Sequence, residues 1–223
     1  MTDLRLVSGG KDEGGAAKVR SALADALAPL QREYVRRLTE MATRVKAESL
    51  LREATTRDES GVLINGPDGF PMRFDVADKE TGSTFEVRSA RYDQPASTFV
   101  RVGALEVELK AGCWEALNID CRFDGNPVGE DAVALCGLLR AFAELGQFGA
   151  FSPRGAAEPW SGRIHSFSVQ VSGNSVAALY DMGSAPPEAL DTLFQALDGF
   201  GRDRAPLAKV ILGGPPPDPA RAL

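Results

Sequence analysis

The chain has 223 residues and a mass of 23.7 kDa, with 43% hydrophobic and 25% charged residues. This composition is typical of a globular protein with one main core. The sequence has no apolar run of about eighteen residues, the minimum for a membrane-spanning helix, and residues 1–15 lack the cationic start and apolar segment of a secretory signal. These features exclude the membrane-spanning classes and predict a cytoplasmic protein.

The formal charge of −6 is unevenly distributed along the chain. Residues 16–57 contain nine Lys and Arg against five Asp and Glu, a charge of +4, whereas residues 58–223 contain 14 against 23, a charge of −9. An acidic body repels a phosphate backbone, which disfavours nucleic acid as a partner. The basic segment can still attract anionic partners.

Composition divides the chain into four regions. Residues 1–15 are Gly-rich and too polar to fold alone, so we expect a flexible N-terminal arm. Residues 16–57 are rich in Ala, Leu, Arg and Glu and contain no Gly, which predicts a helical arm: one long helix kinked at Pro29, or two helices in succession. Residues 58–212 are expected to form an α+β globular domain, and residues 213–223 a Pro-rich C-terminal tail.

Within residues 58–212, alternating apolar and polar residues predict strands, and apolar spacings of three and four predict helices. The expected order is an antiparallel β-meander, a helix at 129–146, a β-hairpin near 163–171 and 175–181, a helix entered through Ser184, and a final strand. With the N-terminal helix, this order predicts the α+β class, with helices against one side of a mainly antiparallel sheet.

The most regular pattern in the chain is an apolar stripe in the predicted N-terminal helix. Its members recur with an eleven-residue period: Val19, Leu23, Leu27, Leu30, Tyr34, Leu38, Met41 and Val45. This period matches a nearly straight helical stripe better than a heptad does. Most such stripes pack into their own protein's core, but a long stripe flanked by flexible arms can also bind another protein or a second copy of the chain. We take these residues as the candidate partner-binding site.

A second pattern is Glu108 and Lys110, two residues apart on a predicted strand, an arrangement that occurs in metal-dependent nucleases. Such an enzyme also needs an upstream Asp near the same cation, and the candidates are Asp75 and Asp93. The surrounding apolar residues alternate with polar ones, as in a strand with one face in water. We therefore interpret Glu108 and Lys110 as part of a solvated sheet face.

Few other residues suggest chemistry. The sequence contains no P-loop, GxGxxG, GxSxG or HExxH motif, and its single His and three Cys form no recognisable metal site, so we expect no metal and no cofactor. His165 is expected at the rim of the core. Trp114 and Trp160 either cover the core or anchor a partner. Cys121 and Cys136 are expected to be buried, reduced thiols.

The predicted order of elements resembles that of the small acidic chaperones of type III secretion, which bind extended segments of client proteins. We therefore predict a non-enzymatic interaction or assembly protein, chaperone-like or adaptor-like. It would bind a protein partner or itself through the N-terminal helix, with a sheet edge as a second surface. Two alternatives remain: a phage or particle structural component whose arms lace subunits together, and a metal-dependent nuclease using Glu108 and Lys110.

Overall fold

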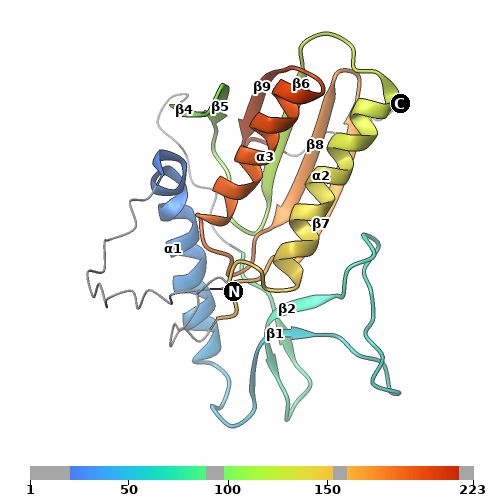
Figure 1. The fold of residues 1–223 in the computed structure, drawn as a ribbon. Helices are drawn as coiled ribbons and strands as arrows, with labels where there is room; N and C mark the ends of the chain where they lie inside the picture. Colours follow the sequence, from blue (N-terminus) through green and yellow to red (C-terminus); the bar gives the residue numbers. More distant parts are fainter. Residues whose placement is uncertain (1–20, 89–97, 153–159, 216–223) are drawn as a thin grey trace, which may run out of the picture.

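The computed structural model describes residues 21–88, 98–152 and 160–215 and confirms the predicted α+β class (Figure 1). The arm predicted at residues 1–15 and most of the predicted C-terminal tail lie outside these ranges. None of the helices in the described ranges is long and apolar enough to cross a lipid bilayer. The elements that form here are α1 (Ala22–Ala42), β1 (Leu50–Thr55), β2 (Arg73–Asp78), β3 (Thr84–Phe85), β4 (Thr98–Val102), β5 (Leu105–Leu109), β6 (Leu117–Phe123), α2 (Gly129–Gln147), β7 (Ser166–Ser172), β8 (Ser175–Asp181), α3 (Ala189–Asp203) and β9 (Leu207–Leu212).

Six strands form a large sheet in the order β4-β5-β9-β6-β8-β7. Neighbouring strands are antiparallel except β5 and β9, which pair in parallel with Val107 opposite Val210. The predicted meander is therefore interrupted, because the last strand of the chain lies between β5 and β6. Alternation along the sequence identifies a strand but does not choose its neighbour, which depends on contacts across the whole fold.

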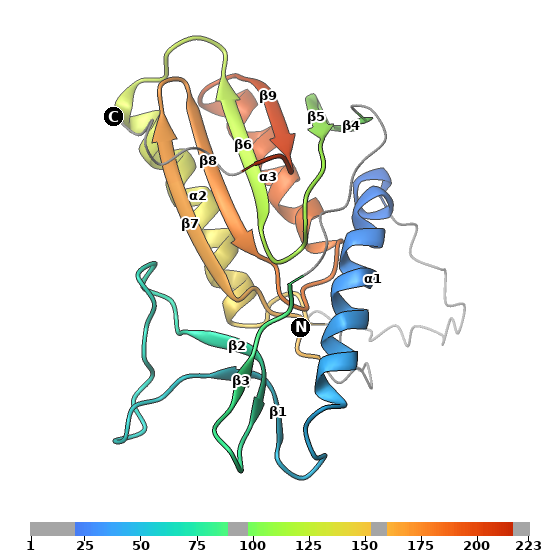
Figure 2. The same cartoon turned by 180° about the vertical axis from the view of Figure 1, so that it is seen from behind.

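The helices α2 and α3 lie side by side on one face of the large sheet (Figures 1 and 2). Gly146 allows α2 to approach the following segment closely, since a Cβ at this position would lie 2.4 Å from Ile164 Cδ1. The buried apolar residues of the two helices recur at helical spacing: Leu135, Leu139 and Phe142 in α2, and Leu190, Leu193, Phe194 and Leu197 in α3.

The second sheet is small, with β1, β2 and β3 paired antiparallel in chain order, and it lies beyond one end of the large sheet (Figure 2). Residues 56–72 form a long hairpin connection between β1 and β2. β1 corrects the prediction that residues 16–57 are helical throughout. Its sequence, LLREAT, favours a helix by propensity, but pairing with β2 overrides that preference.

α1 is one helix and does not divide at Pro29. It begins after Ser21, whose side chain accepts a hydrogen bond from the Ala24 N–H at 3.0 Å, and it ends at Ala42. Its buried residues belong to the same core cluster as those of α2, α3 and both sheets. α1 therefore shares one core with the rest of the described chain.

Candidate functional site

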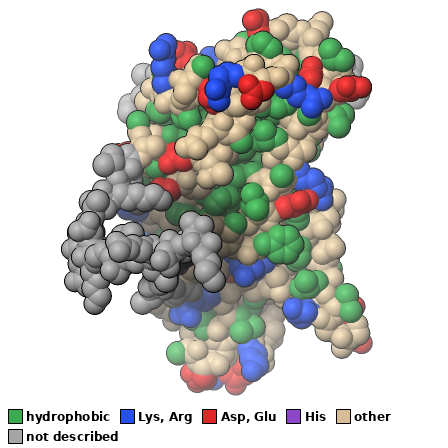
Figure 3. Space-filling model, viewed as in Figure 1, with side chains coloured by type: hydrophobic (Ala, Val, Ile, Leu, Met, Phe, Trp, Pro, Cys, Tyr) green, Lys and Arg blue, Asp and Glu red, His purple; other side chains and the backbone are tan. Residues whose placement is uncertain are grey.

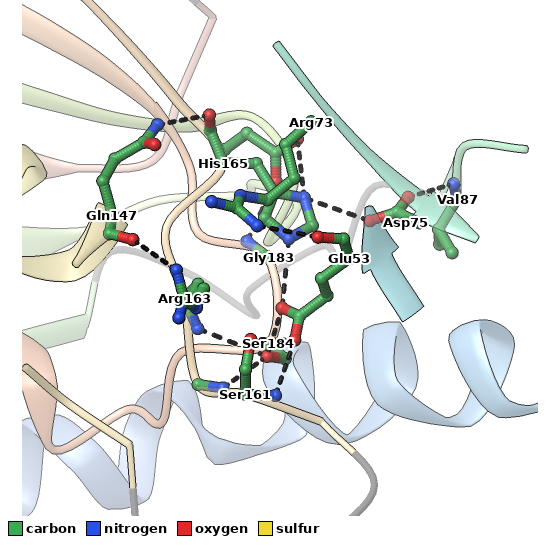
Figure 4. A network of polar contacts seen from close by, with 12 residues as sticks. Glu53, Arg73, Asp75, Val87, Gln147, Ser161, Arg163, His165, Gly183 and Ser184 are labelled. Carbon is green, nitrogen blue, oxygen red and sulfur yellow. Dashed lines mark hydrogen bonds and ion pairs between the residues drawn. The ribbon is translucent and has the colours of Figure 1, made fainter. Parts of the chain in front are cut away.

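Polar side chains from four separate segments meet where the small sheet joins the large sheet (Figure 4). Glu53 comes from β1, Asp75 from β2, His165 from the residue before β7, and Asp181 from the end of β8. The side chains of His165 and Glu53 are only 3% and 2% exposed. We call these four residues the His165 cluster.

Both nitrogens of the His165 ring face carboxylates. Nε2 lies 3.1 Å from Glu53 Oε1, and Nδ1 lies 3.2 Å from Asp75 Oδ1 and 3.8 Å from Asp181 Oδ2. Glu53 and Asp75 lie between the flanking pairs Arg52–Val76 and Ala54–Phe74 of the strands β1 and β2. Two like charges at such positions repel each other, and the imidazolium ring between them offsets that repulsion.

Glu53 is held by an unusual backbone and by several donors. Its φ of 47° is the only positive value among the non-glycine residues that the structure describes. This conformation costs about 1 kcal/mol for a residue with a side chain. The carboxylate accepts a hydrogen bond from the Ser161 N–H at 2.6 Å and from the hydroxyl groups of Ser161 and Ser184. These contacts and His165 together fix the side chain in the core.

Asp75 connects the cluster to two further parts of the fold. It accepts a hydrogen bond from the Tyr34 hydroxyl of α1 and another, at 2.6 Å, from the Val87 N–H after β3. The cluster therefore links α1, the small sheet and the large sheet through buried polar contacts.

The carboxylates keep His165 positively charged. Burial lowers the pKa of His165, but the charges of Asp181, Asp75 and Glu53 outweigh burial and raise it to about 10. Burial raises the pKa of Glu53, but His165 and the serine hydroxyls outweigh burial and lower it to about 2. Burial also raises the pKa of Asp181, to about 6. A protonated ring with both N–H groups engaged cannot accept a proton from a substrate, so His165 is a structural residue and not a general base.

Beside the cluster lies a groove of about 650 Å³, which we call the β7 groove. Among its lining arginines, Arg73 donates to the Glu53 carbonyl at 2.7 Å, and Arg140 pairs with Glu144 at 3.0 Å. Each therefore has one partner within the chain, and carboxylates outnumber arginines among the described lining residues. The charged lining residues other than His165 are Asp68, Glu86, Glu115, Asp181, Arg73 and Arg140.

β7 is the outer strand of the large sheet in the described chain, and part of its length borders the β7 groove. The Phe167 N–H points away from β8 and donates to Asp68 Oδ2 at 3.1 Å. Since N–H groups two residues apart on a strand point the same way, those of Val169 and Val171 also face outward. The strand, SFSVQVS, has no charge, Pro or Gly, and these two valines are 38% and 45% exposed. Charged residues and Pro usually protect the edges of sheets, and β7 has neither. Its edge can therefore accept another strand.

The structure places the predicted partner-binding stripe in the core of this chain. α1 packs this face against α3, β2 and β4, so another protein reaches it only if α1 separates from the body. A binding role for the stripe stays a prediction. Within the stripe, Leu23, Leu27, Leu30, Tyr34, Leu38 and Val45 are buried, Met41 is partly buried, and Val19 lies outside the described residues.

Glu108 does not lie on a solvated face, contrary to our prediction. It is 7% exposed, and its carboxylate lies 2.5 Å from Lys209 Nζ and 3.8 Å from Lys110 Nζ. The unforeseen position of β9 beside β5 brings Lys209 to it. Asp75 belongs to the His165 cluster, and Asp93 lies outside the described residues. No group of His, Cys, Asp and Glu suited to a metal ion occurs in the part of the chain that the structure describes.

The remaining candidates are mainly core residues. Trp114 and Trp160 are 0% and 7% exposed, and Cys121 is buried as predicted, whereas Cys136 is only partly buried. The sequence singles out His165 but does not connect it with Glu53, because Glu53 is 112 residues away in a segment predicted to be helical. The outer position of β7 in the described chain did have a readable signal, namely a strand without charge.

Comparisons with known proteins found no relative of this chain. A scan against protein-family models, a search of curated proteins and a search of solved structures each returned no match to this chain. The function must therefore be inferred from the geometry of the site.

Proposed function

We propose that this protein is a non-enzymatic binding or assembly protein that holds an extended segment of a partner protein against the outer edge of β7, along Val169 and Val171. The observation that carries the proposal is an uncharged edge strand with outward N–H groups beside a groove. Extended segments bind sheet edges by adding a strand: main-chain hydrogen bonds supply affinity, and neighbouring pockets select side chains.

The charges of the β7 groove indicate the chemistry of the partner. Carboxylates outnumber arginines among the described lining residues, and each of these arginines already has one partner inside the chain. A Lys or Arg of the bound segment would lie near Asp181 and be attracted to it. A second copy of this chain pairing through β7 would instead bring two acidic grooves together, so a different protein with a basic segment fits better.

The experiment is to select extended peptides from a displayed random library and to measure their affinity by calorimetry. We expect the selected peptides to carry a basic residue and to protect the amide protons of Val169 and Val171 from exchange. The double variant Val169→Lys/Val171→Lys should weaken binding by about tenfold or more, because charges on an edge oppose strand addition.

The matched control is Val62→Lys/Val128→Lys, since these valines are 61% and 68% exposed and do not line the groove. It should leave the affinity unchanged. Peptides that bind the β7 variant as tightly as the wild type would refute the proposal. Self-association that is lost in the β7 variant would assign the edge to a second copy of the chain.

A further inference from the structure

A second cavity, of about 420 Å³, is lined by β1, β2, the end of α2 and the segment before β7. Among the described residues of its lining, the only carboxylate is that of Glu53, whose oxygens are engaged by His165, Ser161 and Ser184. Figure 3 shows several Lys and Arg side chains on the lower part of the face that it views, around the small sheet. We call the cavity the arginine pocket, because four of its lining residues are Arg52, Arg57, Arg73 and Arg163.

These arginines are only partly satisfied by the protein. Arg57, Arg73 and Arg163 each donate one N–H to a backbone carbonyl, at 2.7, 2.7 and 3.0 Å. None of the four forms an ion pair with a carboxylate in the described ranges. The Nε of Arg73 is buried without a hydrogen-bond partner. A buried, unpaired donor of this kind is costly unless a ligand supplies the acceptor.

Two of the guanidinium groups also lie close enough to repel each other. Burial lowers the pKa of Arg73, and the positive charge of Arg163 lowers it further. An anion bound between them would remove this repulsion and accept hydrogen bonds from both. Guanidinium groups match the oxygens of phosphate in pairs, and several arginines together suit a group with more than one negative charge.

The rim of the pocket is apolar. Phe148, the residue that follows α2, is 85% exposed, and Leu63 of the 56–72 hairpin is 39% exposed. Gln147, another lining residue, has a buried Oε1 without a hydrogen-bond donor. A ligand with an organic group could therefore cover Phe148 while a hydroxyl or amide of the ligand donates to Gln147.

We propose that the arginine pocket binds a small phosphorylated molecule whose organic part packs against Phe148 and Leu63. The cavity volume lies within the range of about 300–1,000 Å³ that is usual for small-molecule sites. This inference does not depend on strand addition at β7. Arg73 borders both cavities, but Arg52, Arg57 and Arg163 line only the arginine pocket, and Val169 lines only the β7 groove.

The test is calorimetry of the full chain at low salt with inorganic phosphate, phenyl phosphate and phenol. We expect phosphate to bind, phenyl phosphate to bind more tightly, and phenol not to bind, with affinity falling as salt is added. Arg52→Gln/Arg57→Gln should weaken the binding of inorganic phosphate and of phenyl phosphate by about tenfold or more, since charge-assisted hydrogen bonds are lost. Both arginines are exposed, so the fold should be retained, as circular dichroism can verify.

A matched control changes two exposed arginines outside the pocket, Arg44→Gln/Arg101→Gln, and should leave both affinities unchanged. Phe148→Ala should abolish the advantage of phenyl phosphate while inorganic phosphate binds as before. Equal losses in the pocket and control variants would show attraction to surface charge alone and refute the proposal. Absence of phosphate binding at low salt would refute it as well.

Discussion

The His165 cluster and the arginine pocket are adjacent polar regions at the junction of the two sheets, and Glu53 contributes to both. In the cluster, carboxylates surround a single imidazolium, and hydroxyl and N–H groups satisfy the remaining oxygens. In the pocket, four cations surround a cavity, and no carboxylate of the described chain pairs with them. The cluster is complete without a ligand, whereas the pocket is not.

This difference separates stability from binding. Buried charges that find all their partners inside the chain join elements of the fold, and removing one partner is costly. Charges that face a cavity without a carboxylate partner contribute less to folding and are available to a ligand. The predictions below test this separation, and they begin with the variant expected to have the largest effect.

Replacing His165 should cause the greatest loss of stability. His165→Gln leaves Glu53 and Asp75 as opposed, buried carboxylates, and we expect the free energy of unfolding to fall by about 3–5 kcal/mol in urea denaturation. The double variant His165→Gln/Glu53→Gln removes one of these charges and should recover part of the loss. A loss below about 1 kcal/mol in the single variant would mean that the cluster does not join the sheets.

The stability of the wild type should depend on pH through the same residue. The pKa of His165 is raised from 6.5 to about 10, so its contribution is complete below pH 6.5 and disappears as the pH rises towards 10. We expect a loss on the order of 5 kcal/mol across this window. The contributions of Asp181 and Glu53 change at lower pH, because their pKa values are about 6 and about 2.

Urea denaturation at several pH values measures this effect, and His165→Gln is the control that should not show it. The protein has a single histidine, so one imidazole NMR signal reports its protonation directly. A midpoint near 6.5 for that signal would contradict the charged state of the cluster.

Gly183 tests how tightly the cluster is packed. Its φ is 48°, and a Cβ there would lie 2.4 Å from the Arg163 carbonyl oxygen and 2.5 Å from His165 Cδ2. Gly183→Ala should therefore cost about 2–3 kcal/mol, through strain and overpacking together. The control is Gly173→Ala, where φ is 57° but nothing lies within 4 Å, so only the backbone cost of about 1 kcal/mol applies. Equal losses of unfolding free energy in Gly183→Ala and Gly173→Ala would show that the residues around Gly183 can move aside for a Cβ atom.

The smallest effect on stability should come from the arginine pocket. Arg57 is exposed and forms no ion pair in the described chain, so Arg57→Gln should change the free energy of unfolding by no more than about 0.5 kcal/mol. Thermal unfolding of Arg57→Gln and of His165→Gln, each measured against the wild type, compares the two losses of stability. A loss of similar size in the two variants would mean that the pocket, like the cluster, is part of the framework of the fold.

The sequence by itself determined the elements whose periodicity is strong. The helix predicted at 129–146 is observed at Gly129–Gln147, and the strand predicted at 175–181 is observed at Ser175–Asp181. These segments could be predicted because apolar spacing depends on which face of an element is buried, and that information is local. The sequence also determined the apolar stripe of α1, although not what covers it.

Tertiary structure decided every feature that depends on partners far apart in the chain. β1 is a strand because β2 pairs with it, Glu108 is buried because β9 lies beside β5, and His165 meets Glu53 across 112 residues. Likewise, the uncharged sequence of β7 was visible from the start, but only the order of strands made it an edge. The physical reason is that a local pattern shows which surface must be buried, while the surface that buries it is chosen by packing of the whole chain.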